Sequence, residues 1–235
     1  MIDRCLICFT EIIPKIGWWA LIAEEKQQTL CATCEGKLQE IEGETCPICS
    51  RPLEGLESRF IKGDYCYDCI RWEEDPQWKG SLTKNTSLYT YNEFLQEVIA
   101  RYKFRGDYIL ARIFSEKVQQ VIKQQKADYL VPIPLSPKRL QERCFNQAEA
   151  ILLEAGLSPA NILNRIHSEK QSKKSRHERI YVEQVFQLET NKHIEGKSIL
   201  LIDDIYTTGS TLRHAAKVLI ENGANSVSSL TIARG

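Results

Sequence analysis

The 235-residue sequence has no long uninterrupted run of apolar residues. A membrane-spanning helix needs about 20 such residues in a row, so we expect no membrane insertion. The first residues also lack the apolar stretch of a secretory signal peptide, because Cys5 and Cys8 stand there. We therefore expect a cytoplasmic protein.

The sequence also has no net charge, since 31 Lys and Arg residues balance 31 Asp and Glu residues. Any nucleic-acid binding must therefore come from a local basic patch and not from the field of the whole chain. Neither the G-x-x-x-x-G-K-[ST] phosphate loop nor the G-x-G-x-x-G dinucleotide pattern is present, and this excludes two common nucleotide sites.

Cysteine, by contrast, is abundant, and eight of the nine cysteines form four C-x-x-C pairs. Two thiolates at this spacing converge on one tetrahedral ion, so the pattern predicts two structural Zn²⁺ sites and not disulfides. Sequential use of the pairs is the simplest arrangement, with cross-braced pairing, an iron–sulfur cluster and a redox C-x-x-C as alternatives. The expected ligands are Cys5, Cys8, Cys31 and Cys34 for one site, and Cys46, Cys49, Cys66 and Cys69 for the other.

All four pairs lie in residues 1–80, which we expect to form a small cysteine-rich zinc-binding domain. This part has little apolar material for a core of its own, so bound zinc would supply folding free energy on the order of 10 kcal/mol per site. The polar stretch 72–87, with Pro76 and Gly80, is typical of a linker. Residues 81–235 would form the second domain.

Apolar patterning in residues 81–235 predicts an α/β domain with a parallel sheet flanked by helices. We expect strands at 87–91, 129–133, 162–166, 199–202 and 227–232. Helices are expected from the N-cap Asn92 to about residue 105, over 108–125, and after residue 211.

The stretch that organises this domain is S-I-L-L-I-D-D-I-Y-T-T-G-S-T, residues 198–211. Four consecutive apolar residues predict a strand covered on both faces, closed by the carboxylates Asp203 and Asp204. A hydroxyl-rich turn then opens a helix, whose free N–H groups suit a phosphate, while the carboxylates suit sugar hydroxyls or Mg²⁺. The pattern favours a sugar-phosphate site, and an ordinary strand-to-helix turn is the alternative.

This stretch resembles the phosphoribosyl pyrophosphate (PRPP) loop of type I phosphoribosyltransferases. The resemblance implies that Asp203 and Asp204 hold the ribose hydroxyls, with Mg²⁺ accompanying PRPP. It also implies that the turn holds the 5′-phosphate, through Thr207, Thr208, Gly209, Ser210 and Thr211.

A second turn rich in proline follows the strand predicted at 129–133. Its sequence, V-P-I-P-L-S-P-K-R-L-Q-E-R-C-F-N-Q-A, is similar to a segment of the ComF family of competence-associated proteins, as is Y-K-F-R-G-D at residues 102–107. That family combines a phosphoribosyltransferase-like domain with an N-terminal zinc finger. The resemblance implies pyrophosphate contacts from Pro134, Ser136, Lys138 and Arg139. The glycine usual before F-N-Q-A is Cys144 here.

Two basic stretches are candidates for contacts with DNA or phosphate. In residues 101–105 basic and aromatic residues alternate, as in a surface that stacks bases, although a helix end with favourable cations has the same pattern. Residues 165–179 form a basic segment that suits a nucleic-acid backbone or a solvated loop. The candidates are Arg101, Lys103, Arg105, Arg165, Lys173, Lys174, Arg176 and Arg179.

The ComF resemblance implies a protein that handles incoming single-stranded DNA during natural transformation, with a Mg²⁺–PRPP site. It also implies, as partners, a ComFA-like DNA-translocation helicase and recombination loading proteins. An active phosphoribosyltransferase, joining PRPP to a nitrogen nucleophile with release of pyrophosphate, is the alternative. No catalytic residue is assigned. A zinc adaptor with an inactive ligand domain is a third possibility, which the presence of both aspartates disfavours.

Overall fold

The computed structural model describes residues 3–13, 28–166, 185–189 and 193–235. At its centre lies a four-stranded sheet in the order β5-β10-β9-β6, in which every neighbouring pair is parallel. This confirms the expected parallel α/β sheet. Its strands are β5 (Asn85–Thr90), β6 (Tyr129–Pro132), β9 (Ser198–Tyr206) and β10 (Ser226–Arg234).

Strand β9 is buried on both faces because its apolar run has no polar alternation. Leu200 and Ile202 belong to one core cluster, and Ile199 and Leu201 belong to the other. Successive strand residues point to opposite faces, so one short run supplies both halves of the core.

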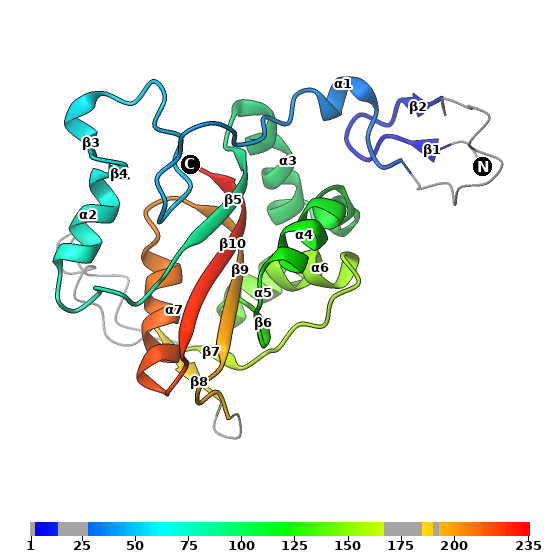
Figure 1. The fold of residues 1–235 in the computed structure, drawn as a ribbon. Coiled ribbons are helices and arrows are strands. Elements are labelled where there is room, and N and C mark those ends of the chain that lie inside the picture. Colours follow the sequence, from blue (N-terminus) through cyan, green and yellow to red (C-terminus); the bar gives the residue numbers. More distant parts are fainter. Residues whose placement is uncertain (1–2, 14–27, 167–184, 190–192) are drawn as a thin grey trace.

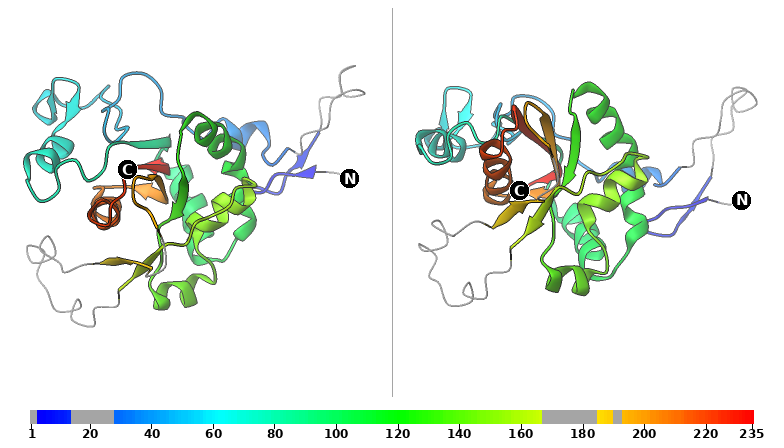
Figure 2. Two further views of the ribbon diagram at one scale, coloured as in Figure 1. Left: turned by 60° about the horizontal axis from the view of Figure 1, so that its bottom comes forward. Right: turned by 90° about the horizontal axis from the view of Figure 1, so that it is seen from below.

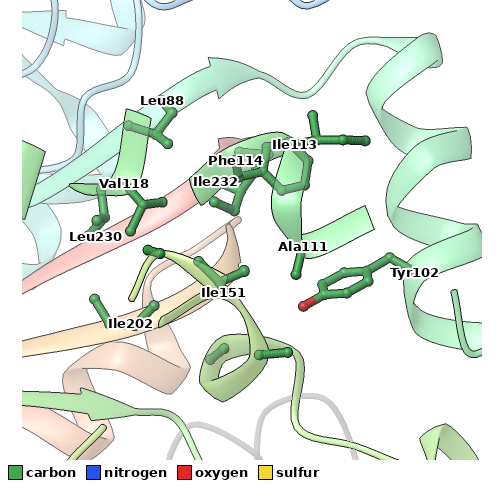
Figure 3. Close-up of a cluster of buried hydrophobic side chains, with 14 of the residues drawn as sticks. Leu88, Tyr102, Ala111, Ile113, Phe114, Val118, Ile151, Ile202, Leu230 and Ile232 are labelled. Atoms are coloured by element: carbon green, nitrogen blue, oxygen red, sulfur yellow. The ribbon is translucent and has the colours of Figure 1, made fainter. Parts of the chain in front are cut away.

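Helices on one side of the sheet form the larger layer in Figure 1: α3 (Glu93–Phe104), α4 (Arg112–Gln124) and α6 (Gln147–Glu154). Figure 3 shows Phe114, Val118 and Ile151 from this layer beside Ile202 and Leu230 of the sheet. On the other side lies α7 (Ser210–Glu221). No helix in the described part of the chain is both long and apolar enough to cross a bilayer.

Helix α3 begins as expected, because the Asn92 side chain accepts a hydrogen bond from the Leu95 N–H at 2.9 Å. It ends at Phe104, and Gly106 follows the C-cap residue Arg105 with a φ of 71° that suits a glycine. The helix expected over 108–125 is divided into a 3-10 turn at Tyr108–Ala111 and α4.

The strand expected at 162–166 exists as β7 (Leu163–Arg165), but it does not join the parallel sheet. It pairs antiparallel with β8 (Phe186–Leu188) to form a separate ribbon (Figure 2). Phe186 is fully buried in the core beside α7, so the ribbon packs on the sheet layer and does not extend it.

Two small cysteine modules lie at opposite sides of the molecule (Figures 1 and 2). The first contains the hairpin β1 (Asp3–Arg4) and β2 (Glu11–Ile12), followed by α1 (Ala32–Glu35). The second contains the hairpin β3 (Ile61–Lys62) and β4 (Tyr65–Cys66), followed by α2 (Tyr67–Glu74).

The chain between the two modules covers the open edge of β5. Thr90 N–H donates to the Gln39 carbonyl at 2.8 Å, and Ile41 N–H donates to the Leu88 carbonyl at 3.0 Å. An exposed edge strand offers unpaired backbone groups to other chains, and this segment satisfies them.

The interpretation of residues 72–87 as a linker is wrong. Trp78 and Leu82 are buried, at 4% and 2% exposure, and Thr83 N–H donates to the Val227 carbonyl of β10 at 2.8 Å. The aromatic and apolar residues among the polar ones anchor the segment on the core. The division of the chain at residue 80 stays a prediction.

Asn85 joins the second cysteine module to the sheet. Its side-chain amide donates to Ser87 Oγ at 2.8 Å and to the Cys49 carbonyl at 3.4 Å, and its Oδ1 accepts from Ser229 Oγ at 2.8 Å. Asn85 is fully buried, so each of these groups would lose its partner without water to replace it.

We therefore expect Asn85→Ala to lower the free energy of unfolding by about 2 kcal/mol, measured by urea denaturation. Thr83→Ala, an exposed neighbour, is the control and should stay within about 0.5 kcal/mol of the wild type. Equal unfolding midpoints for the two variants would contradict this role.

Candidate functional site

The two loops predicted to bind the ligand lie side by side at one edge of the sheet. Strands β6 and β9 are parallel neighbours, with Pro132 opposite Ile202, so their carboxyl ends coincide. Ile133 N–H extends the pairing by donating to the Ile202 carbonyl at 2.9 Å. Open α/β sheets bind ligands at such carboxyl ends.

Strand β9 is longer than its apolar run predicts. It continues past Asp203 and Asp204 to Tyr206, because β10 pairs with it as far as Arg234 opposite Tyr206. The aspartates therefore lie within the strand, not after it, and alternation directs them to opposite sides of the sheet edge. The Asp204 N–H donates to Asp203 Oδ1 at 2.9 Å and ties the two together.

Lys103, at the end of α3, binds the second aspartate. Its ammonium lies 2.8 Å from Asp204 Oδ2, and the two side chains are only 15% and 12% exposed. Lys103 was a candidate for DNA contact, and the structure instead places it in the carboxylate site. Sequence reasoning missed this role because Lys103 and Asp204 are far apart in the chain.

The carboxylate pair concentrates negative charge at the strand end. Burial and the nearby Asp204 charge together raise the pKa of Asp203 to about 7, although the Asp204 N–H, Lys103 and Arg165 each act to lower it. Two neighbouring carboxylates suit a ligand that brings hydroxyl groups or a cation.

The turn after β9 has the shape of an anion loop. Gly209 adopts φ 80° and ψ 0° at the N-terminus of α7, and Ser210 begins the helix. A Cβ at Gly209 would lie 2.2 Å from Tyr206 Oη, so this position requires glycine in both backbone and space. Thr207, Thr208 and Thr211 are exposed around it. The N–H groups of the first helical turn suit a phosphate, although that of Ser210 already donates to Thr208 Oγ1 at 3.4 Å.

The proline-rich loop after β6 leads into α5 (Pro137–Arg143). Ser136 caps this helix by accepting from the Arg139 N–H at 3.3 Å, and Asn146 holds the loop by donating to the Ile133 carbonyl at 3.0 Å. Pro134 is half-buried, whereas Lys138 is exposed and lies 3.9 Å from Glu142. Asn146 was not among the predicted site residues.

Arg165 of β7 is a cation whose charge acts on the first aspartate. Burial lowers the pKa of the Arg165 guanidinium, the neighbouring Arg139 also lowers it, and Asp203 raises it. Cys144, where the family has glycine, takes a left-handed φ of 68° and so keeps the backbone of a glycine.

The other basic candidates differ in their surroundings. Arg101 donates to Asp107 Oδ2 at 3.0 Å and to the Ile7 carbonyl at 2.7 Å, so its charge is engaged within the protein. Tyr102 is buried at 1% exposure and cannot stack a base, whereas Arg105 is exposed. Lys173, Lys174, Arg176 and Arg179 lie outside the described residues.

Each cysteine module brings four sulfur atoms together, and the grouping is sequential. Within each tetrad the ligand atoms lie within 4.8 Å of one another. Two sulfurs on one tetrahedral zinc lie about 3.8 Å apart, since Zn–S is about 2.3 Å. The Cys8–Cys31 and Cys49–Cys66 sulfurs are 3.6 Å apart, so both tetrads fit zinc. We call Cys5, Cys8, Cys31 and Cys34 the first tetrad, and Cys46, Cys49, Cys66 and Cys69 the second tetrad.

The two tetrads repeat one local design. In each, a C-x-x-C turn is followed by a residue with positive φ, Phe9 at 61° and Ser50 at 57°. In each, the third cysteine, Cys31 or Cys66, is the N-cap of a short helix that carries the fourth. This internal repeat was visible in the spacing of the pairs but was not predicted.

Arg213 was also missed. It is fully buried in the first turn of α7, and its Nη1 lies 2.9 Å from Glu73 Oε1. The signal was present, because Arg213 falls on the apolar face of that helix together with Ala216 and Ile220. A buried arginine needs a fixed partner, and the partner lies on α2.

Comparison with known proteins agrees with this geometry. Residues 108–235 match the family model described as "Phosphoribosyl transferase domain". Over 98% of its length the chain is 39% identical to "Competence protein ComFC" of Bacillus subtilis, covering 94% of that protein.

Two further relatives extend the likeness. The chain is 32% identical to "Competence protein ComFC" of Streptococcus pneumoniae, covering 98% of this chain and all of the relative. It is 24% identical to "DNA utilization protein YhgH" of Escherichia coli K12, over 84% of this chain and 87% of that protein. The chain therefore belongs to the ComF family of competence proteins, whose larger part is a phosphoribosyl transferase domain.

Proposed function

We propose that this protein handles single-stranded DNA during natural transformation and carries a binding site for Mg²⁺–PRPP. The observation that carries the proposal is the meeting of the Asp203–Asp204 pair and the Gly209 loop at one sheet edge, in a chain whose relatives are named for competence and DNA utilization. We further propose that it acts in the cytoplasm, with a ComFA-like helicase and recombination loading proteins as partners.

In the proposed site, each part of the ligand meets a group of matching chemistry. The carboxylates of Asp203 and Asp204 accept hydrogen bonds from ribose hydroxyls, and the N–H groups of residues 207–211 donate to the 5′-phosphate. Arg165, whose charge acts on Asp203, and its neighbour Arg139 would face the pyrophosphate. Bound Mg²⁺ would offset the charge of the pyrophosphate.

We expect Asp203→Asn and Asp204→Asn each to weaken PRPP binding by about 10- to 100-fold in calorimetry with Mg²⁺. Each removes a charged acceptor, and such hydrogen bonds are worth about 1.5–3 kcal/mol. Asp128→Asn is a matched control, because Asp128 binds Lys197 and the Ser198 N–H at the opposite end of β9. Unchanged affinity in the Asp203 and Asp204 variants would refute the site.

The tetrads supply a second test of the proposal. We expect about two zinc ions per purified chain by elemental analysis, one in each tetrad, and about one in Cys66→Ser. Iron in place of zinc, or an unchanged zinc content in the variant, would contradict the assignment.

For DNA binding we propose a surface that includes Phe104 and Arg143, in place of the whole alternating stretch at residues 101–105. Phe104 is 73% exposed at the end of α3, and the Arg143 guanidinium of α5 lies 5.5 Å from its ring centroid. Arg105 and Arg139 are exposed on the same two elements. An exposed ring among cations suits a single strand, since a base stacks on the ring and the cations bind the backbone.

We expect Phe104→Ala to weaken binding of an oligothymidylate about tenfold, because stacking on an aromatic ring contributes about 1–3 kcal/mol per base. Arg143→Ala should reduce the salt dependence of the affinity by about one charge. Phe60→Ala is the matched control, since Phe60 is 40% exposed and Arg59 lies over its ring at 4.7 Å. Equal losses in the Phe104 and Phe60 variants would contradict the assigned surface.

Arg139 and Arg165 also favour a second candidate function, an active phosphoribosyltransferase. Arg165, which interacts with Asp203, and the neighbouring Arg139 would stabilise the negative charge that develops on departing pyrophosphate. Pyrophosphate release from PRPP, Mg²⁺ and a panel of nitrogenous bases would distinguish this function from binding alone.

A further inference from the structure

Side chains from elsewhere in the fold donate to the carbonyl groups of residues 206–208, at the start of the phosphate loop (residues 207–211). Arg234 Nη1 donates to the Thr207 carbonyl at 3.0 Å and, at 3.2 Å, to the Tyr206 carbonyl, which also accepts from the Gly235 N–H at 2.9 Å. Trp72 Nε1 donates to the Thr208 carbonyl at 2.9 Å. Both side chains are remote from the loop in sequence.

These hydrogen bonds also orient the N–H groups that would bind a phosphate. In a trans peptide the C=O and N–H groups point in opposite directions, and the chain has no cis peptide among its described residues. The carbonyls of residues 206, 207 and 208 share peptides with the N–H groups of Thr207, Thr208 and Gly209. Holding the carbonyls toward Arg234 and Trp72 therefore turns these three N–H groups away from those two side chains.

Both donors are connected to the second tetrad. Arg234 Nη2 lies 3.6 Å from Cys49 Sγ, so one guanidinium contacts a cysteine and the loop at once. Trp72 lies on α2, the helix that Cys66 caps and that contains Cys69. Cys49 is therefore connected to the loop through Arg234, and Cys66 and Cys69 are connected to it through α2 and Trp72.

Further contacts fix α2 against the helix that follows the loop. Glu73 Oε1 lies 2.9 Å from Arg213 Nη1 in the first turn of α7, and the Arg213 guanidinium lies 5.2 Å from a Trp72 ring centroid. Trp78 packs between the Trp72 and His214 rings, with centroid distances of 5.5 and 4.5 Å. Several contacts therefore hold the Trp72 indole N–H in place: those with Trp78 and Arg213, and the ion pair of Glu73 with Arg213.

We propose that the second tetrad, once it holds its metal, positions the phosphate loop, with Arg234 and Trp72 as the positioning residues. Four thiolates on a divalent cation leave an excess of negative charge, which the Arg234 guanidinium faces. Binding of a phosphorylated sugar then depends on this tetrad. The inference rests on the proposed sugar-phosphate site and adds the group that shapes it.

The first tetrad offers a contrast within the same chain. It packs against α3, where Phe94 contacts its cluster and Arg101 donates to the Ile7 carbonyl. Its contacts therefore lead to a different element, and the two tetrads have different roles.

The test is the affinity for ribose 5-phosphate, measured by calorimetry on the full chain with its zinc content checked. Trp72→Phe keeps an aromatic ring but removes the N–H donor, and should weaken binding about three- to tenfold, as expected for one hydrogen bond. Arg234→Lys should weaken it at least as much. Tyr67→Phe and Arg71→Lys, exposed residues of α2, are the matched controls and should bind as the wild type does.

A merely structural role would lower the melting temperature and the affinity for single-stranded DNA together with the affinity for the sugar phosphate. We expect Trp72→Phe to keep the wild-type melting temperature and DNA affinity, and to lose only affinity for the sugar phosphate. Sugar-phosphate affinity equal to that of Tyr67→Phe would overturn the inference, as would a parallel loss of DNA affinity.

Hydrogen exchange of the loop amides, measured without ligand, separates this inference from the proposed function. The amides of Thr207–Ser210 should exchange faster in Trp72→Phe, and faster in the wild type after a chelator has removed zinc. Unchanged exchange in both would refute the positioning role. If exchange responds but the wild type binds no ribose 5-phosphate, the proposed ligand is wrong and the positioning of the loop stands.

Discussion

The parallel pairing of β9 with β6 and β10 is the constraint on which the candidate site depends. It brings two loops that are some 70 residues apart in sequence to one edge of the sheet, with Pro132 opposite Ile202. It also keeps Asp203 and Asp204 in extended backbone, so that they diverge across the edge. Without that register, the carboxylates and the proline-rich loop would be unrelated surface features.

Charge at this edge is balanced by residues from several elements. The carboxylates would repel each other and any phosphate, but Lys103 from α3 contacts one of them, and Arg165 from β7 opposes the charge of the other. The ligand proposed here has hydroxyls for the carboxylates and phosphates for the loops.

The two cysteine tetrads share a local design but differ in their surroundings. The second is completely buried and forms one apolar cluster with Ile199, Leu201 and Leu212, whereas Cys8 of the first is exposed at the periphery. Because the second tetrad contacts the central sheet, its metal would be part of the core of the larger domain. The first tetrad therefore resembles a separate zinc finger, whereas the second is packed into the core.

Patterns local in sequence determined much of this protein: the buried strand at 199–202, the Asn92 cap, the loop that requires glycine at position 209, and two sets of metal ligands at C-x-x-C spacing. Each depends on neighbours a few residues away, which the chain specifies directly. The ion pair of Lys103 with Asp204 and the contacts of Arg234 and Trp72 with the phosphate loop were decided only by tertiary structure. The hydrogen bonds of Arg234 and Trp72 with the loop join residues 27 and 136 positions apart, and no periodicity or spacing records which distant side chain will satisfy a given carbonyl or carboxylate.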